Sequence, residues 1–101
     1  MIIYNVTVKV ATDAHFQWLD WMLEEHIPAM LATGLFSDYR MSRLLEQDDQ
    51  EGPTYTVQYF AENLGQYHLF REKYQQALRQ RGHAIFGDRF IAFTTVMEVV
   101  K

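Results

Sequence analysis

Hydrophobic side chains repeat along this chain with two different periods, and the order of the repeating segments limits the folds open to it. Alternation of apolar and other side chains is typical of strands, and three- and four-residue spacing is typical of amphipathic helices. The predicted strands are residues 2–10, 36–46, 54–61 and 89–100, and the predicted helices are residues 13–33 and 63–82. Two split βαβ units in this order close into a four-stranded antiparallel sheet, order 4-1-3-2, with both helices on one face. The sequence therefore predicts an α+β, ferredoxin-like βαββαβ fold.

The first predicted helix has a proline near its middle. Its apolar stripe is formed by Phe16, Leu19, Leu23, Ile27 and Met30. Pro28 has no N–H for the carbonyl group of Glu24, and its ring disfavours helical geometry at the residue before it. We therefore expect the helix to break at His26–Ile27, and the break to turn His26 towards the space between helix and sheet.

Capping signals set the expected helix ends. Thr12 or Asp13 is an expected N-cap of the first helix, and Gly34 stands where a C-terminal glycine belongs. Asn63 followed by Gln66 resembles a capping box, which predicts the start of the second helix, and its end is expected near Gly82.

The sheet face that the helices leave uncovered is expected to be poor in charge. If Ile91, Phe93 and Met97 face the helices, the residues on the other face are Ile3, Asn5, Thr7, Thr56, Gln58, Phe60, Ala92, Thr94 and Val96, with the charged Lys9 and Glu98 only near the strand ends. A sheet face in water normally carries charged residues. This face therefore predicts a homodimer that packs sheet against sheet, with a threonine-rich hydrated face as the alternative.

Size and composition bound the class of protein. The chain has 101 residues, 49% of them hydrophobic, which predicts one domain over residues 1–101 with a single core. It has no cysteine, so disulfides and thiolate sites are excluded. The first residues form a strand pattern rather than a leader peptide, and no apolar run could span a bilayer. We expect a cytoplasmic protein without a membrane partner.

Charge gives no reason to expect a nucleic-acid partner. The net charge is −4, and the lysines and arginines form no cluster. The first strand superficially resembles that of RNA-recognition motifs, but its Tyr4 shares the core side with Val6 and Val8. No nucleic-acid binding is therefore predicted.

One row of side chains on the first helix has the composition of a binding site. His15, Trp18, Met22 and His26 follow one another at three- and four-residue spacing beside the apolar stripe. An aromatic and histidine row at a helix break suits a cavity for a small apolar or aromatic molecule. In the alternative interpretation Trp18 and Met22 are core residues, and His26 donates to a carbonyl group of the broken helix, such as that of Met22.

A second candidate lies on the other helix. Arg71 follows Tyr67 by four residues and falls within the apolar stripe, where it could bind a ligand carboxylate. In the alternative interpretation its guanidinium reaches water and stacks on the tyrosine. The four histidines lack metal-binding spacing, so no metal site is expected. No cofactor is predicted, although haem bound through a histidine stays open.

Several stretches together resemble a known family: IIYNVTV, WLDWMLEEHIPAMLATGLF, TYTVQY, FGDRFIAF and MEVV. The chain resembles a small bacterial family described only as a domain of unknown function. The resemblance covers essentially the whole chain. It implies membership of the dimeric α/β-barrel superfamily, which includes antibiotic-biosynthesis and haem-degrading monooxygenases. It implies the fold and a dimer, and it supplies no activity.

Three functions stay open on this basis. The first is a homodimer that binds a small apolar or aromatic ligand between helices and sheet. The second is a cofactor-independent monooxygenase or isomerase in which His26 is the candidate catalytic, proton-transfer residue. The third is a purely structural dimer without ligand. The sequence leaves undecided whether the protein is an enzyme, and which ligand, reaction or pathway it serves.

Overall fold

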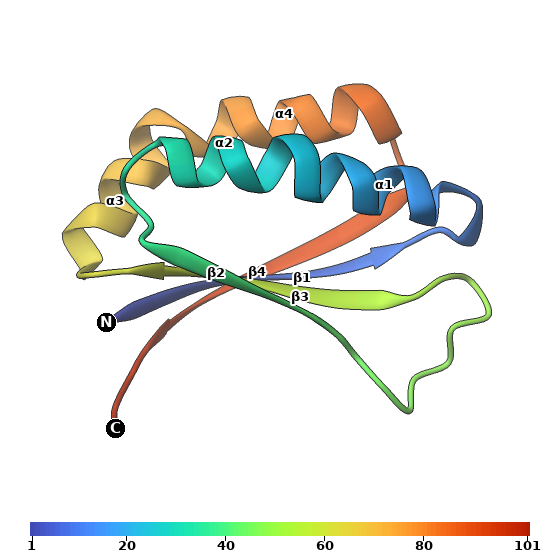
Figure 1. The fold of residues 1–101 in the computed structure, drawn as a ribbon, viewed down its shortest axis with the longest axis horizontal. Helices are drawn as coiled ribbons and strands as arrows, with labels where there is room; N and C mark the ends of the chain where they lie inside the picture. Colours follow the sequence, from blue (N-terminus) through green and yellow to red (C-terminus); the bar gives the residue numbers. More distant parts are fainter.

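The computed structural model describes residues 1–101 and shows one four-stranded antiparallel sheet with all the helices on one face (Figure 1). The strands are β1 (Ile2–Val10), β2 (Asp38–Arg43), β3 (Thr54–Ala61) and β4 (Phe90–Glu98). They lie in the order β2-β3-β1-β4, which confirms the predicted order read from the other edge. The ferredoxin-like prediction is therefore confirmed.

The first helical segment is continuous and contains a π-helical turn. It consists of a 3₁₀ turn η1 (Thr12–Ala14), α1 (His15–Trp21), the π turn η2 (Met22–His26) and α2 (Ile27–Ala32). Ile27 has helical angles, φ −60° and ψ −45°, and its N–H donates to the carbonyl oxygen of Met22 five residues earlier. The predicted break at His26–Ile27 is therefore wrong. A wider turn accommodates Pro28 without interrupting the helix.

The spacing of buried residues explains why this turn is π-helical. Trp18, Met22, Ile27 and Met30 are all buried. At about 100° per residue, a regular α-helix would put Ile27 about 180° away from Trp18. A π turn takes up one extra residue, which returns Ile27 to about 80° and Met30 to about 20° from Trp18. The π turn therefore lets both halves of the helix face the sheet.

The apolar stripe predicted for this helix is partly wrong for the same reason. Phe16 is 78% exposed and Leu23 is 48% exposed, so the N-terminal half buries Trp18 and Met22 in their place. Of the two caps expected for this helix, only the C-terminal one is observed. Gly34 has a positive φ of 76° after the last helical turn, as predicted, whereas no side chain caps the start of η1 or α1.

The second helical segment is divided into α3 (Leu64–Lys73) and α4 (Gln75–Phe86). The capping-box-like start is confirmed: the Gln66 N–H donates to Oδ1 of the N-cap Asn63 at 3.0 Å. The Gln66 side chain reaches back to the residue before the N-cap, where its Oε1 accepts from the Glu62 N–H at 3.0 Å. Tyr74 leaves helical geometry between the two helices, at φ −125° and ψ −29°. The predicted end near Gly82 is wrong, because α4 continues to Phe86, where Gly87 ends it with a φ of 57°.

Strand register corrects one predicted face of the sheet. Val8 of β1 lies opposite Ala92, and Val6 lies opposite Thr94, so these β4 residues face the helices. The uncovered face instead carries the other set of β4 residues: Ile91, Phe93, Thr95 and Met97. Apolar residues occur at both alternating positions of β4, so composition alone did not distinguish its faces; pairing with β1 does.

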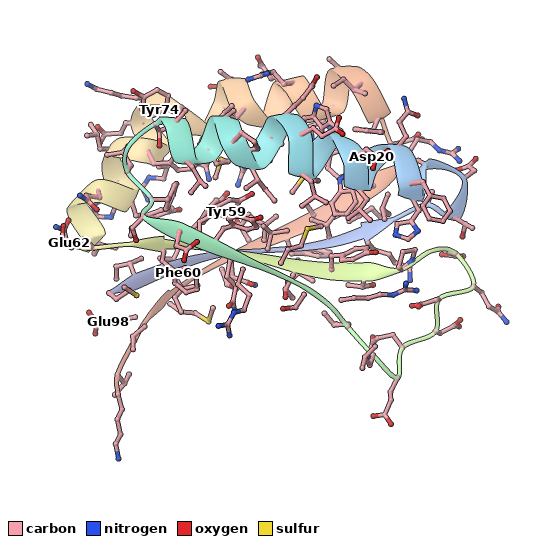
Figure 2. The ribbon with its side chains drawn as sticks, viewed as in Figure 1. Asp20, Tyr59, Phe60, Glu62, Tyr74 and Glu98 are labelled. Carbon is pink, nitrogen blue, oxygen red and sulfur yellow. The ribbon has the colours of Figure 1, made fainter.

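The core lies between the sheet and the helices. Its fully buried large side chains are Trp18, Tyr59, Phe70, Ile27, Val10 and Val57. Figure 2 shows Tyr59 in the layer between β3 and the helices. Tyr4 is also buried there, on the core side as predicted, which leaves its ring unavailable for stacking on a base.

None of the helices combines the length and the apolar character needed to cross a membrane.

Candidate functional site

A cavity of about 590 Å³ lies between the helices and the sheet. It is bounded by α1 and η2, by α4, and by β1 and β4, with one contribution each from α2, α3 and β3. Its aromatic lining consists of Tyr4, Trp18, Trp21, Tyr59, Phe70, Phe90 and, at the edge strand β4, Phe93. The volume and the predominantly apolar lining are typical of sites for small molecules.

Three of the predicted site residues line this cavity together. Trp18, Met22 and His26 all contribute to its wall. Trp18 is 1% exposed and Met22 is also buried, so both are core residues as well as lining residues. The two interpretations of this row are therefore compatible: the same side chains complete the core and border the cavity.

His15 lies outside the cavity. Its Nε2 is 2.6 Å from the hydroxyl oxygen of Tyr55 on β3. Burial, and then the positive charge of Arg43, lower the pKa of His15. The His15 imidazole therefore belongs to a separate polar contact between the start of α1 and the sheet.

Arg71 and Tyr67 are also outside the cavity lining. Arg71 is exposed, and its guanidinium carbon lies 5.8 Å from the centre of the Tyr67 ring. This geometry is a cation–π contact at the surface, so the stacked arrangement of Arg71 is the one observed. The ring of Tyr67 itself is buried against Tyr4, with 5.4 Å between centroids.

His26 lines the cavity with its ring stacked on that of Trp21. Their ring centroids are 4.8 Å apart and their planes differ by 25°. Burial, followed by the nearby charge of Arg81, lowers the pKa of His26 to about 4. The imidazole is therefore neutral at pH 7, and it can offer one donor and one acceptor nitrogen. The carbonyl group of Met22, the expected partner of this side chain, accepts from the Ile27 N–H instead.

A polar cluster at the cavity wall was missed by sequence reasoning. Gln75 Nε2 donates to the hydroxyl oxygen of Tyr4 at 3.0 Å, and Arg79 Nη2 approaches the same oxygen at 3.5 Å. Gln75 and Arg79 are one helical turn apart on α4 and point to the same side. Their four-residue spacing was the available signal.

Trp21 was also missed, and Gly82 explains its position. A Cβ added to Gly82 would lie 3.3 Å from Trp21 Cη2, so the absence of a side chain lets the indole pack against α4. A glycine inside a helix costs about 1 kcal/mol relative to alanine. A glycine inside a helix, as at Gly82, was the sequence feature that could have indicated close packing of another side chain against α4.

Two polar atoms among the lining residues have no partner within the protein. They are the indole N–H of Trp21 and the hydroxyl group of Tyr59. Burial, followed by Tyr4 and Tyr39, raises the pKa of Tyr59, so its hydroxyl group stays protonated. Buried polar groups are normally hydrogen-bonded, so these atoms have capacity for a further partner. No group of three His, Asp or Glu side chains is placed to bind a metal ion.

The family comparison covers nearly the whole chain. The model of a family described as a domain of unknown function (DUF4286) matches residues 1–100. No curated protein matches the sequence.

Solved structures share the fold at low sequence identity. An EthD-family protein from Bacillus halodurans is 10% identical, with a TM-score of 0.68 over 99% of this chain and 100% of that one. A dimeric ferredoxin-like protein from an uncultured marine organism is 11% identical, with a TM-score of 0.64 over 99% and 95%. A mutant of MhuD, described with two manganese protoporphyrin IX molecules per active site, is 16% identical, with a TM-score of 0.67 over 100% and 96%. These similarities establish the fold.

Proposed function

The chain belongs to the DUF4286 family, a domain of unknown function, and we propose that it is a homodimeric protein that binds a small apolar or aromatic ligand between its helices and its sheet. The cavity carries this proposal. It is a partly open space of about 590 Å³, and its lining is predominantly hydrophobic. The neutral imidazole of His26 in the cavity wall gives such a ligand a polar contact.

The uncovered sheet face supports the dimer. Ile91 is 59% exposed and Phe93 is 68% exposed, and both lie on this face with Met97. Strand β4 is an edge strand without a charged residue from Phe90 to Met97. Long, apolar, uncharged edges pair or aggregate unless they are covered.

The centre of the same face has an unsatisfied acceptor. Asn5 Nδ2 lies 3.2 Å from Thr7 Oγ1 and 3.2 Å from Thr95 Oγ1, whereas its Oδ1 is buried without a partner. This oxygen is already shielded within the single chain, so the dimer proposal rests on the exposed apolar residues of the face. A solved structure of the same fold is described as dimeric, which agrees with the proposal.

Haem is one planar molecule that suits this cavity. The aromatic walls match a flat ring, and a neutral imidazole such as His26 is the form that binds iron. His26 and His83 are the histidines of the lining that would hold the metal. Titration with hemin tests this case: a shifted Soret band that disappears in His26→Ala supports it, and an unshifted band contradicts it.

The second candidate function is a cofactor-independent monooxygenase or isomerase with His26 as the proton acceptor. The neutral His26 imidazole beside an aromatic cavity favours it, although a pKa of about 4 makes His26 a weak base at pH 7. Loss of turnover in a folded His26→Ala variant, with ligand affinity retained, would distinguish this enzyme from a binding protein.

Native mass spectrometry of the protein purified from its own host tests the proposal. We expect a mass of two chains plus a small molecule that is released when the complex is activated. Ala92→Phe, which places a ring in the cavity from β4, is expected to lose the small molecule, and Ala84→Phe on the exposed side of α4 is expected to keep it. A ligand-free dimer would leave a structural dimer as the function, and a monomer would contradict the dimer.

A further inference from the structure

The charged side chains that line the cavity are of one sign only. No aspartate or glutamate contributes to its lining, whereas Arg79 does. The two ion pairs of the chain join Arg43 to Asp49 and Arg89 to Asp13, so Arg79 has no carboxylate partner. Arg79 is therefore the one arginine, lysine or carboxylate side chain of the lining, and an anionic group of a ligand would be drawn to it.

Two donors at this wall share one weak acceptor. Gln75 Nε2 and Arg79 Nη2 both approach the hydroxyl oxygen of Tyr4, at 3.0 and 3.5 Å. Tyr4 is 3% exposed, and its hydroxyl proton has no acceptor in the protein. Three donor groups therefore meet at one point: the Gln75 amide, the Arg79 guanidinium and the Tyr4 hydroxyl group. The first two share the Tyr4 oxygen as acceptor, and the Tyr4 hydroxyl proton has none.

We propose that the ligand of this cavity carries a carboxylate, which Arg79 binds together with the Gln75 amide and the Tyr4 hydroxyl group, while its apolar body lies among the aromatic side chains. This inference rests on the proposed function and adds the chemical class of the ligand. A carboxylate accepts up to four hydrogen bonds and can pair with a guanidinium through both oxygens. It replaces the shared Tyr4 oxygen as acceptor for all three donors.

The three donors lie on rigid elements of the fold. Gln75 and Arg79 occupy successive turns of α4, and Tyr4 is the third residue of β1, with Tyr67 and Phe70 packed against its ring. Arg79 itself is exposed, so it lies where a ligand would enter the cavity. A ligand that enters with its apolar end first would leave its carboxylate beside Arg79. The expected arrangement has the apolar end of the ligand inside and the acid end at α4.

A matched pair of probes tests the inference in the full-length protein. The probes are 2-naphthoate and 2-naphthalenemethanol, which share the ring and differ in the charged group. Their dissociation constants are measured by titration calorimetry. We expect the acid to bind the wild type at least about 10-fold more tightly than the alcohol, because a charge-assisted hydrogen bond contributes more than a neutral one.

Variants identify the residue responsible. Arg79→Gln is expected to weaken the acid about 10-fold or more and to change the alcohol less than about twofold. Arg79→Lys should retain part of the preference, since it keeps the charge and loses the paired geometry. Arg71→Gln, the same change on an exposed arginine outside the lining, should leave both constants unchanged.

The outcomes distinguish the carboxylate assignment from the proposed binding of an apolar ligand. Equal affinity for both probes, or a preference that survives Arg79→Gln, overturns the carboxylate assignment and leaves the proposed apolar site intact. If neither probe binds the wild type, the proposed cavity function fails and this inference fails with it.

Discussion

The rings of Trp21 and His26 stack at 4.8 Å although the residues are five positions apart in one helix. In a regular α-helix such residues point about 140° apart and their side chains do not meet. The π turn at Met22–His26 takes up one extra residue and reduces this angle to about 40°. The same turn therefore makes the stack, accommodates Pro28 and brings His26 to the cavity.

Removing one residue from the π turn should expose the role of Pro28. Deletion of Glu24, which is exposed, leaves Trp18, Met22, Ile27 and Met30 on one face of a regular α-helix. Pro28 would then lie in an α-helix interior, where it costs about 3 kcal/mol. We expect the deletion to lower the free energy of unfolding by about this amount, measured by urea denaturation, and Pro28→Ala in the deletion background to restore most of it.

Pro28→Ala alone is the matched control. In the wild type the wide turn already accommodates the proline, so the substitution should change the free energy of unfolding by less than about 1 kcal/mol. If Pro28→Ala has the same effect in both backgrounds, the π turn is not what accommodates the proline.

Stability should depend on pH through His26. Its pKa is about 4 in the folded chain and near 6.5 in the unfolded chain. Between these values the unfolded state binds a proton that the folded state does not, so the free energy of unfolding falls as the pH drops from 6.5 to 4. His26→Gln should remove this part of the slope in urea denaturation at pH 7.0, 5.5 and 4.5.

The wild type and His26→Gln share their other titrating groups, including His15, whose pKa is lowered as well. The stability difference between the two proteins should therefore shift steadily against the wild type as the pH falls. Parallel stability profiles for the two proteins would show that His26 titrates normally in the folded state.

Element order and topology could be predicted from the sequence because they depend on local periodicity. Strand β3 was predicted at residues 54–61, where Tyr55, Val57 and Tyr59 alternate and are all buried. The helix interior could not be predicted in the same way. Phe16 and Leu23 extend a regular 3.6-residue stripe that the π turn breaks, and the choice between two apolar sets was decided by packing against the sheet.

The candidate site was predictable where one helix supplies it. Trp18, Met22 and His26 follow from spacing within a single segment. The Tyr4–Gln75 contact joins residues 71 positions apart, so it depends on how α4 lies over β1. The close approach of Gly82 to Trp21 likewise follows from tertiary packing, which no pattern within either helix specifies.

A charge on the uncovered sheet face should dissociate the proposed dimer. Phe93→Lys places an ammonium group in the proposed interface, where an unpaired charge costs several kcal/mol. We expect monomers by light scattering at a concentration where the wild type is dimeric. Phe16→Lys, the same change on an exposed phenylalanine of α1, should leave the dimer intact. A wild type that is monomeric at high micromolar concentration would refute the dimer, and a dimeric Phe93→Lys protein would refute this interface.

Binding of an apolar ligand in the space between helices and sheet is tested most directly by occupancy of that space by a neutral probe. Ala92 is exposed and lines the cavity from β4, on the same side of the sheet as the helices, so Ala92→Phe should place a ring in the cavity without displacing the buried core. The measurement is the dissociation constant of 2-naphthalenemethanol, by titration calorimetry, for the wild type, Ala92→Phe and the exposed control Ala84→Phe. We expect saturable binding to the wild type and to Ala84→Phe, and affinity at least about 10-fold weaker for Ala92→Phe, because the added ring removes the probe's apolar contacts. Absence of binding to the wild type, or equal affinity in all three proteins, would contradict the proposed binding.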